Sequence, residues 1–375
     1  MAQQLLFGVF LSALFIQLIY YWGIFSRLAF YKDSSVPNPG KNRDEPVSVI
    51  ICARNESKNL RKNLYSVLQQ SYPKFQVIVV NDCSFDDTGD FLKQMEKEYS
   101  HLKIVTIPEQ EKYEHGKKFA LTLGIKAAQH DLLLFTDADC MPTSKNWLAN
   151  MQSRFHRGFQ QKEIVLGYGA YEKKKGLLNK LIRFDTFYTA LQYLSFSLIG
   201  KTYMGVGRNL AYRKSLFFRN KGFASHYDLV SGDDDLFINE TANNKNASIE
   251  ISSESFTYSE PRKNFKHWFN QKRRHTTTGM RYKLKFKFML GLLFISHFLF
   301  YASLISLLAI QFDFKILLLL FSIRLLTQLI IWGMSMKKLK EWDLWLLSPI
   351  LDFFTVIFYL TLAVSNLFFR VNKWI

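Results

Sequence analysis

In the middle of the chain, short runs of apolar residues alternate with longer segments whose apolar residues recur every three or four positions. The short runs predict buried strands, and the longer segments predict amphipathic helices. The predicted strands are residues 47–51, 76–80, 102–107 and 132–135, and the predicted helices between them are residues 56–70, 85–99 and 117–128. Strands that alternate with helices predict a mostly parallel sheet with right-handed crossovers, which is an α/β fold.

Long apolar segments near both ends of the chain predict membrane helices. Residues 5–25 carry no charge and are long enough to cross a bilayer. No small-residue cleavage site follows them, so we expect residues 1–30 to be a retained transmembrane anchor rather than a removed signal peptide. A second apolar region, residues 288–370, divides into three candidate spans at 288–310, 314–334 and 345–368. The pattern therefore predicts a multi-pass membrane protein.

Two charged residues, Arg324 and Asp352, lie inside predicted spans. Charges at such positions usually face the interior of a helix bundle or a polar pathway. The alternative is that Arg324 extends to the membrane surface and that Asp352 lies near a helix end, and the sequence favours neither interpretation. A channel or transporter is a further hypothesis, but four spans are few for it and most polar residues lie outside them.

The chain is strongly basic, with 49 Lys and Arg against 31 Asp and Glu and a net charge of +18. Basic residues gather beside the predicted spans, where anionic lipid headgroups explain them better than nucleic acid does. With one span before the middle region and three after it, the clusters at Arg27 and Lys32, at residues 281–287 and at residues 337–340 fall on one side. We expect that side to be cytoplasmic, in the cell (inner) membrane.

Several ligand-binding signatures are absent. No Gly-x-Gly-x-x-Gly follows the first strand, which argues against a dinucleotide site, and Gly116-Lys117 lacks the other residues of a phosphate loop. Lys117 could still reach a base or a diphosphate as a point charge. No zinc-finger or RNA-recognition signature occurs, and the three cysteines predict reduced thiols without a zinc site.

Polar side chains follow the predicted strands at the point where each strand ends. Glu56 follows the first strand, Asp82 the second, and Asp137 and Asp139 follow residues 132–135. Because the carboxyl ends of parallel strands border one crevice, we expect Glu56, Asp82 and Asp137 to line it. Two carboxylates one residue apart also suit a hard divalent cation that shares its oxygen ligands with a substrate's phosphates.

Acidic residues also occur where helices are expected to begin. Asp233, Asp234 and Asp235 stand in a row, and crowding of like charges raises the pKa of one of them, which suits a general base. The competing interpretation is an acidic helix start, which the helix dipole favours. Capping likewise competes as an explanation for Ser84 or Asp86, but Asp82 comes too early for it.

Three further segments have two interpretations each. Residues 176–200 predict either an amphipathic helix, at the membrane surface or lining a groove, or an ordinary buried helix. Gly205 and Gly207 allow close backbone approach to a ligand, or simply form a turn. Residues 263–287 mix aromatic and basic side chains and predict an interfacial amphipathic segment, whose Arg274 binds either lipid headgroups or a departing diphosphate.

Together these residues resemble the membrane-bound family 2 glycosyltransferases, which have a GT-A catalytic domain. The resemblance covers about residues 45–285, with the catalytic domain at 44–262, and depends on motifs that occur in the family's order. The motifs are residues 47–56, Asn81-Asp82-Cys83-Ser84, Gly116-Lys117, Thr136-Asp137-Ala138-Asp139, residues 207–212, residues 232–235 and residues 271–274.

The resemblance implies roles for particular residues. Those implied for nucleotide-sugar binding are Ala53, Arg54, Asn55, Glu56, Asp82, Lys117 and Asp137. Those implied for the acceptor are Gly207, Asn209 and Asp235. Asp139 is implied as the ligand of Mg²⁺ or Mn²⁺. Asp234 is implied as the catalytic base, and Asp233, Gln271 and Arg274 as further catalytic residues, with Arg274 at the departing diphosphate.

The implied activity is inverting transfer of a sugar from a nucleotide-diphosphate sugar, expected to be a UDP-sugar, to a membrane-associated lipid-linked or polysaccharide acceptor. No nucleic-acid partner is implied. Two alternatives remain, a processive polysaccharide synthase with its own translocation path and a non-catalytic membrane scaffold. His275 stands where the processive synthases have Trp, which weakens the first, and every acidic position is filled, which weakens the second.

Overall fold

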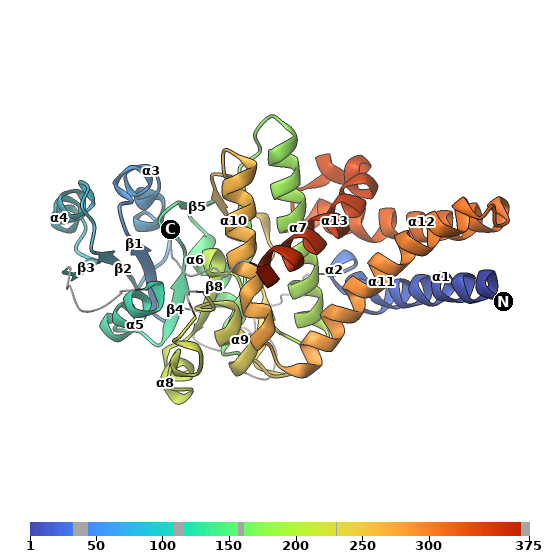
Figure 1. The fold of residues 1–375 in the computed structure, drawn as a ribbon. Coiled ribbons are helices and arrows are strands. Elements are labelled where there is room, and N and C mark those ends of the chain that lie inside the picture. Colours follow the sequence, from blue (N-terminus) through green and yellow to red (C-terminus); the bar gives the residue numbers. More distant parts are fainter. Residues whose placement is uncertain (33–43, 109–115, 157–160, 230, 369–375) are drawn as a thin grey trace. The chain divides into compact units, whose positions relative to one another are not determined.

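The computed structural model describes residues 1–32, 44–108, 116–156, 161–229 and 231–368. These residues form two compact units, each of which is discontinuous in sequence (Figure 1). The α/β unit comprises described residues within 44–174 and 200–263, and the helical unit comprises residues 1–32, 175–199 and 264–368. The range predicted for the catalytic domain, 44–262, thus runs through a segment that packs with the helical unit.

The α/β unit is built on a mostly parallel sheet, as predicted. In the described residues its strand order is β3-β2-β1-β4-β8-β6-β9, and only β8 runs antiparallel to its neighbours. The strands are β1 Val47–Ala53, β2 Phe75–Asp82, β3 Leu102–Ile107, β4 Leu132–Phe135, β6 Ile164–Leu166, β8 Leu210–Arg213 and β9 Ala247–Ile249. The α-helices of this unit are α3 Ser57–Leu68, α4 Thr88–Glu98, α5 Lys117–Ala127, α6 Trp147–Ser153, α8 Lys214–Arg219 and α9 Asp235–Thr241.

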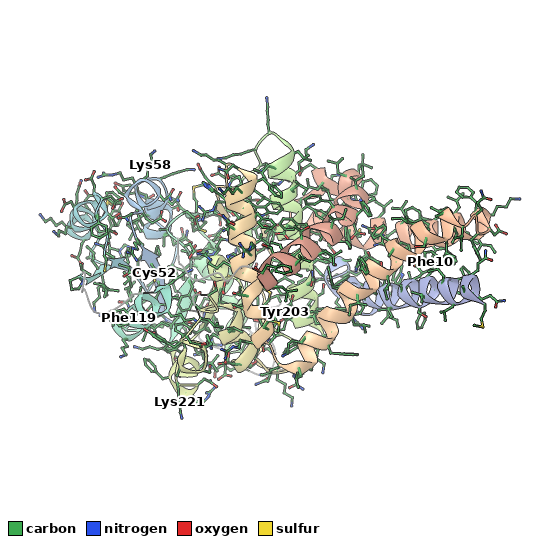
Figure 2. The ribbon with its side chains drawn as sticks, viewed as in Figure 1. Phe10, Cys52, Lys58, Phe119, Tyr203 and Lys221 are labelled. Atoms are coloured by element: carbon green, nitrogen blue, oxygen red, sulfur yellow. The ribbon has the colours of Figure 1, made fainter. Side chains whose placement is uncertain are left out.

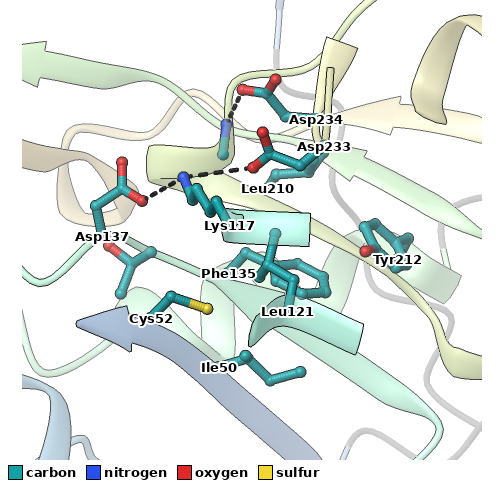
Figure 3. A pocket seen from close by; sticks show the side chains of 12 residues that line it. Ile50, Cys52, Lys117, Leu121, Phe135, Asp137, Leu210, Tyr212, Asp233 and Asp234 are labelled. Atoms are coloured by element: carbon teal, nitrogen blue, oxygen red, sulfur yellow. Dashed lines mark hydrogen bonds and ion pairs between the residues drawn. The ribbon is translucent and has the colours of Figure 1, made fainter. Parts of the chain in front are cut away.

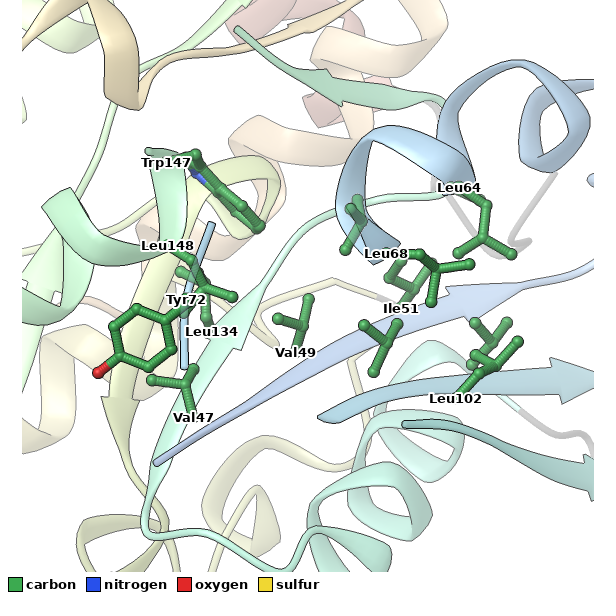
Figure 4. Close-up of a cluster of buried hydrophobic side chains, with 14 of the residues drawn as sticks. Val47, Val49, Ile51, Leu64, Leu68, Tyr72, Leu102, Leu134, Trp147 and Leu148 are labelled. Carbon is green, nitrogen blue, oxygen red and sulfur yellow. The ribbon is translucent and has the colours of Figure 1, made fainter. Parts of the chain in front are cut away.

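The first four strands pair in parallel, and their side chains alternate between two covered faces of the sheet. Val47, Val49 and Ile51 belong to a core cluster that includes residues of α3, α4 and α6 (Figure 4). Ile50 points to the opposite face, where α5 packs. A Cβ at Gly124 of α5 would lie 2.9 Å from the Ile50 side chain, so the glycine permits this close helix–sheet contact.

A second, smaller sheet lies in the same unit, with strand order β5-β10-β7. Its strands are β5 Cys140–Pro142, β7 Gly169–Tyr171 and β10 Thr257–Ser259. β5 begins at the residue after Asp139, and β10 pairs with both of its neighbours. The small sheet therefore borders the acidic residues that follow β4.

In the helical unit, four segments of the described chain are long and apolar enough to cross a membrane, one near the N-terminus and three after residue 283. They cover Ala2–Ala29, Leu284–Ala309, Phe314–Lys338 and Trp342–Phe368. The helices are α1 Ala2–Ile19, η1 Tyr20–Phe25, α2 Ser26–Ala29, α7 Leu177–Leu198, α10 Phe265–Thr276, α11 Leu284–Ala309, α12 Phe314–Lys338, η7 Trp342–Leu347 and α13 Ser348–Phe368. Phe10 of α1 is fully buried in a cluster with Phe300 and Leu317 (Figure 2).

Arg324 and Asp352 face each other inside the helical unit. Arg324 Nη2 lies 2.5 Å from Asp352 Oδ2, and both residues are 1% exposed. The other guanidinium nitrogens donate to Gln17 and Gln328, and the Tyr301 hydroxyl donates to Asp352. This network supports the bundle-interior interpretation and contradicts the one in which Arg324 extends to the surface.

Helix α7 is an ordinary buried helix rather than one that lies on a membrane surface. Most of its residues are buried, including the charged Arg183 and Asp185. Arg183 Nη2 lies 2.5 Å from Glu341 Oε2, and Lys272 Nζ lies 2.7 Å from Asp185 Oδ2. These pairs remove the cost of burying isolated charges and tie α7 to other segments of the helical unit.

Candidate functional site

The loops after β1 and β2 are joined by hydrogen bonds. The Asn55 backbone N–H donates to Ser84 Oγ at 2.9 Å, and Asn55 Oδ1 accepts from the Phe85 N–H at 2.8 Å. Asn55 has φ +56°, a left-handed conformation that asparagine tolerates better than most residues. The Thr88 N–H donates to Asp86 Oδ1, so Asp86 fits the capping interpretation whereas Ser84 joins the two loops.

The predicted nucleotide-binding residues at these strand ends differ in exposure. Arg54 and Asn55 are exposed and Glu56 is partly buried, whereas Ala53 is 2% exposed and Asp82 1%. Burial raises the pKa of Glu56, and a hydrogen bond from Asn59 opposes that shift. Arg54, Asn55 and Glu56 therefore offer side chains at the surface, whereas Ala53 and Asp82 are covered.

A pocket at the ends of β1 and β4 brings five of the predicted site residues together, namely Lys117, Asp137, Gly207, Asp233 and Asp234 (Figure 3). Lys117, the first residue of α5, lies between two carboxylates, with Nζ 2.9 Å from Asp137 Oδ1 and 3.4 Å from Asp233 Oδ2. Burial acts to lower the pKa of Lys117, but these carboxylates outweigh it and hold the pKa well above its ordinary value. Lys117 is thus a fixed positive charge in the pocket, with Asp234 beside it.

Asp234 lies between β8 and the start of α9. Its Oδ2 accepts from the Gly207 N–H at 2.7 Å and its Oδ1 from the Asp235 N–H at 2.7 Å, so it caps α9 and also lines the pocket. Burial, and then the charges of Asp233 and Asp235, raise the pKa of Asp234 to about 7. A carboxylate with a pKa near neutrality is suited to accept a proton at physiological pH.

Asp139 is the centre of a possible metal site. Ligand atoms of Asp137, Asp139 and Cys140 lie within 4.8 Å of one another. Burial, and then the charge of Asp137, raise the pKa of Asp139, as expected for crowded carboxylates. The Cys140 thiol donates to Asp139 Oδ1, which leaves carboxylate oxygens as the donors. Such a donor set fits Mg²⁺ or Mn²⁺, which prefer oxygen.

Asn209 does not have the surroundings expected of an acceptor-binding residue. It is 0% exposed, its Oδ1 accepts from Trp147 Nε1, and its Nδ2 donates to the carbonyls of Tyr168 and Ser255. These bonds use both amide hydrogens, so the side chain holds the small sheet, α6 and β8 together. Asp235 is also buried, and its Oδ1 accepts from the Leu236 N–H. The structure thus argues against direct contact of either residue with an acceptor.

Arg208 is a site residue that sequence reasoning missed. It lies between Gly207 and Asn209 in the short η3 turn, and its guanidinium stacks 4.2 Å above the Tyr171 ring. Its charge acts on Asp137 and Asp139. The only signal in the sequence was its place inside the 207–212 motif, because the residues that surround it come from distant strands.

Gln271 and Arg274 lie on α10, which belongs to the helical unit. Both are partly buried, and the neighbouring His275 is exposed. The α10 helix is held by Arg273 Nε, which donates to Asn366 Oδ1 at 3.2 Å, and by stacking of Trp268 on Phe358 at 4.4 Å. Roles of Gln271 and Arg274 at a diphosphate remain predictions.

The fold is that of the GT-A class. A mannosyltransferase from Pyrobaculum calidifontis, solved in complex with GDP-Man and Mn²⁺, aligns with 99% of this chain and 100% of its own, at a TM-score of 0.61 and 17% sequence identity. At that identity the likeness concerns the fold alone. Residues 48–218 match the family model of glycosyl transferase family 2.

Curated relatives match over shorter segments. Glycosyltransferase AglE of Haloferax volcanii is 38% identical over 104 residues, 27% of this chain and 33% of the relative. Probable glycosyltransferase YdaM of Bacillus subtilis is 32% identical over 144 residues, 36% of this chain and 34% of the relative. A poly-β-1,6-N-acetyl-D-glucosamine synthase of Staphylococcus epidermidis is 31% identical over 125 residues, 32% of this chain and 28% of the relative. The matches thus span about a third of the relatives' length.

Proposed function

We propose that this protein is an inverting glycosyltransferase that transfers a sugar from a nucleotide-diphosphate sugar to a membrane-associated lipid-linked or polysaccharide acceptor. The observation that carries the proposal is Asp234, whose raised pKa and position in the pocket suit a general base. The family 2 domain supports sugar transfer, and the four apolar helices support an acceptor at a membrane.

In this mechanism Asp234 accepts the proton of an acceptor hydroxyl. The hydroxyl oxygen forms a bond to the anomeric carbon as the bond from that carbon to the diphosphate breaks on the opposite face, which inverts the configuration. Asp233 and Lys117 set the charge around Asp234, because the Asp233 carboxylate raises the pKa of Asp234 and the Lys117 ammonium, which pairs with Asp233, lowers it. General base assistance is typically worth about 10²–10⁴-fold in rate.

The donor's nucleotide belongs, in this proposal, at the ends of β1 and β2. Arg54, Asn55 and Glu56 offer exposed or partly exposed side chains there, with Lys117 and Asp137 nearer the diphosphate. Asp139, with Asp137, would hold Mg²⁺ or Mn²⁺, which supplies positive charge to the leaving diphosphate. Both a UDP-sugar and a GDP-sugar are donors to test.

The proposed setting is the cell (inner) membrane, with the catalytic domain in the cytoplasm. Three basic clusters flank the apolar helices on the side that the positive-inside rule makes cytoplasmic. Nucleotide-sugars are made in the cytoplasm, so that orientation gives the pocket its donor.

The deciding experiment measures sugar transfer by the purified full chain with a panel of nucleotide-sugars. We expect Asp234→Asn to lower kcat about 10²–10⁴-fold while nucleotide affinity stays within twofold, because the amide fills the same space but cannot take a proton. Asp90→Asn, an exposed carboxylate on α4, is the matched control and should keep full activity. Wild-type turnover by the Asp234 variant would remove the proposed base.

Metal dependence is tested by Mn²⁺ binding as well as by activity. We expect Asp139→Asn to abolish Mn²⁺ binding measured by calorimetry and electron paramagnetic resonance, and a chelator to abolish transfer by the wild-type protein. Undiminished Mn²⁺ binding by this variant would exclude Asp139 as a ligand.

A further inference from the structure

Arg208 is held by two strands of the small sheet, β7 and β10. Its guanidinium stacks on the Tyr171 ring of β7 at 4.2 Å, and its Nη1 donates to the Ala170 carbonyl at 3.2 Å and to Ser259 Oγ of β10 at 2.8 Å. A Cβ at Gly169 would lie 3.0 Å from Arg208 Cβ, so the glycine makes room for the side chain. The small sheet therefore forms a rigid cradle around one arginine.

The guanidinium is held, but its hydrogen-bonding capacity is only partly used. Among the residues that the structure describes, Nε and Nη2 of Arg208 make no hydrogen bond, whereas Nη1 makes two. Arg208 is also only partly buried. A planar guanidinium with Nε and Nη2 available presents the two-pronged donor edge that matches the oxygens of a phosphate.

The cradle also places this charge beside the acidic end of β4. The Thr136 hydroxyl donates to the Arg208 carbonyl at 3.1 Å, which joins η3 to the residue before Asp137. The charges of Asp137 and Asp139 act on Arg208, and β5 of the small sheet starts directly after Asp139. A fixed cation beside a metal site would oppose metal binding unless an anion shared the space with both.

We propose that Arg208 binds the diphosphate of the nucleotide donor directly, as a fixed cation that acts beside the metal. The proposal rests on the proposed function, because it assumes a nucleoside diphosphate at this site. Arg208 is expected to contribute in the absence of metal as well as in its presence. Arg208 would hold the diphosphate in the donor complex and would stabilise the negative charge that develops on the diphosphate as the sugar leaves.

The test measures binding of UDP, GDP and the matching nucleoside monophosphates to the full chain in detergent, with and without Mn²⁺. We expect Arg208→Gln to weaken diphosphate binding about 10- to 100-fold, both with and without Mn²⁺. Monophosphate binding should change less than threefold, since the terminal phosphate is absent. Arg208→Lys keeps the charge without the two-pronged donor edge, so its diphosphate affinity should lie between those of the wild-type protein and the Gln variant.

The matched control is Arg61→Gln. Arg61 is an exposed residue of α3 whose guanidinium also stacks on an aromatic ring, that of Phe91 in α4, at 4.7 Å. Its loss should leave nucleotide binding unchanged. Thermal unfolding of each variant separates loss of binding from loss of fold, and if the Gln variant does not fold, the Lys variant decides.

Equal diphosphate affinity in folded wild-type and Arg208 variants would overturn the proposal. Weaker diphosphate binding by the variants only in samples that contain Mn²⁺ would overturn the proposal too, because Arg208 would then act by positioning Asp139. Failure of the wild-type chain to bind either diphosphate would instead count against the proposed function itself.

Discussion

Carboxylates of one chemical type have different properties in this protein because their neighbours differ. Asp234 accepts two backbone N–H groups and has a pKa raised to about 7 by burial and by adjacent carboxylates. Asp137 is paired with Lys117, and Asp352 with a buried arginine. Asp234 therefore combines a partly exposed position with a pKa near neutrality.

The pKa of Asp234 makes a prediction for the pH profile of transfer. A general base works as the carboxylate, and a raised pKa means that this form is lost as pH falls through about 7. We expect kcat/KM to fall about tenfold per pH unit below that value. Asp233→Asn removes a neighbouring negative charge and should move this acid limb to lower pH. The pH dependence is measured from initial rates at fixed ionic strength. If the apparent pKa of the acid limb is the same in Asp233→Asn as in the wild-type protein, the assignment of that limb to Asp234 is contradicted.

Asn209 makes a prediction about stability rather than chemistry. Replacing it with Ala leaves Trp147 Nε1 and the Ser255 carbonyl without this partner, whereas the Tyr168 carbonyl keeps the Thr257 N–H, and each unsatisfied buried group costs about 1–3 kcal/mol. We expect a clearly lower Tm for Asn209→Ala and an unchanged KM for the acceptor. Asn220→Ala, an exposed change of the same type, should leave Tm within about a degree or two. A raised acceptor KM with an unchanged Tm would restore the acceptor role.

At the scale of elements, short strands with little stability of their own shape the site. β5, β7 and β10 have three residues each, and none would form alone. Together they make a sheet that supplies Tyr171 and Ser259 to Arg208 and starts directly after Asp139. The larger sheet supplies the rigid edge from which the acidic residues project.

In the helical unit, the Arg324–Asp352 pair makes a prediction about packing between α12 and α13. Removing one partner leaves an uncompensated buried charge, which typically costs 3–5 kcal/mol, whereas replacing both with apolar residues costs much less. We expect Arg324→Met and Asp352→Leu each to lower Tm in detergent more than the double variant does. If the decrease in Tm of the double variant equals the sum of the decreases in the two single variants, the two residues are not coupled.

At the scale of the whole molecule, the chain alternates between the two units. It leaves the α/β unit after residue 174, returns at residue 200, and leaves again after residue 263. The segment that returns contains β8, the η3 turn and α9, and so contributes Arg208 and Asp234 to the site. The α/β unit is therefore incomplete without residues on both sides of α7, and a single cut cannot separate it from the helical unit.

Topology in the membrane is tested by labelling introduced cysteines in intact cells with an impermeant thiol reagent. We expect Cys at Gln311, an exposed position between α11 and α12, to react from outside, and Cys at Lys340, between α12 and η7, to react only after lysis. The chain without an introduced cysteine gives the background from its native thiols. Labelling of Lys340→Cys in intact cells would invert the proposed orientation.

The sequence by itself determined the elements whose residues repeat with a local period. β3 and β4 have the predicted bounds, and the other predicted strands and helices of the first half differ by a few residues at their ends. The four apolar helices were likewise predictable, because length and lack of charge are local properties. The rule that parallel strands end at one edge predicted Glu56, Asp82 and Asp137 in one crevice, and of these the pocket contains Asp137. The family resemblance implied the roles of Lys117, Asp233 and Asp234, which line the same pocket.

Only the tertiary structure decided which side chains meet across long stretches of chain. Asn209 bonds to residues 41 to 62 positions away, and Arg324 to one that is 28 positions away, so no spacing in the sequence could assign their partners. The same reason explains why Arg208 went unnoticed and why two interpretations of α7 stayed open. Periodicity records which face of an element is buried, whereas the identity of the residue that covers it depends on how distant segments pack.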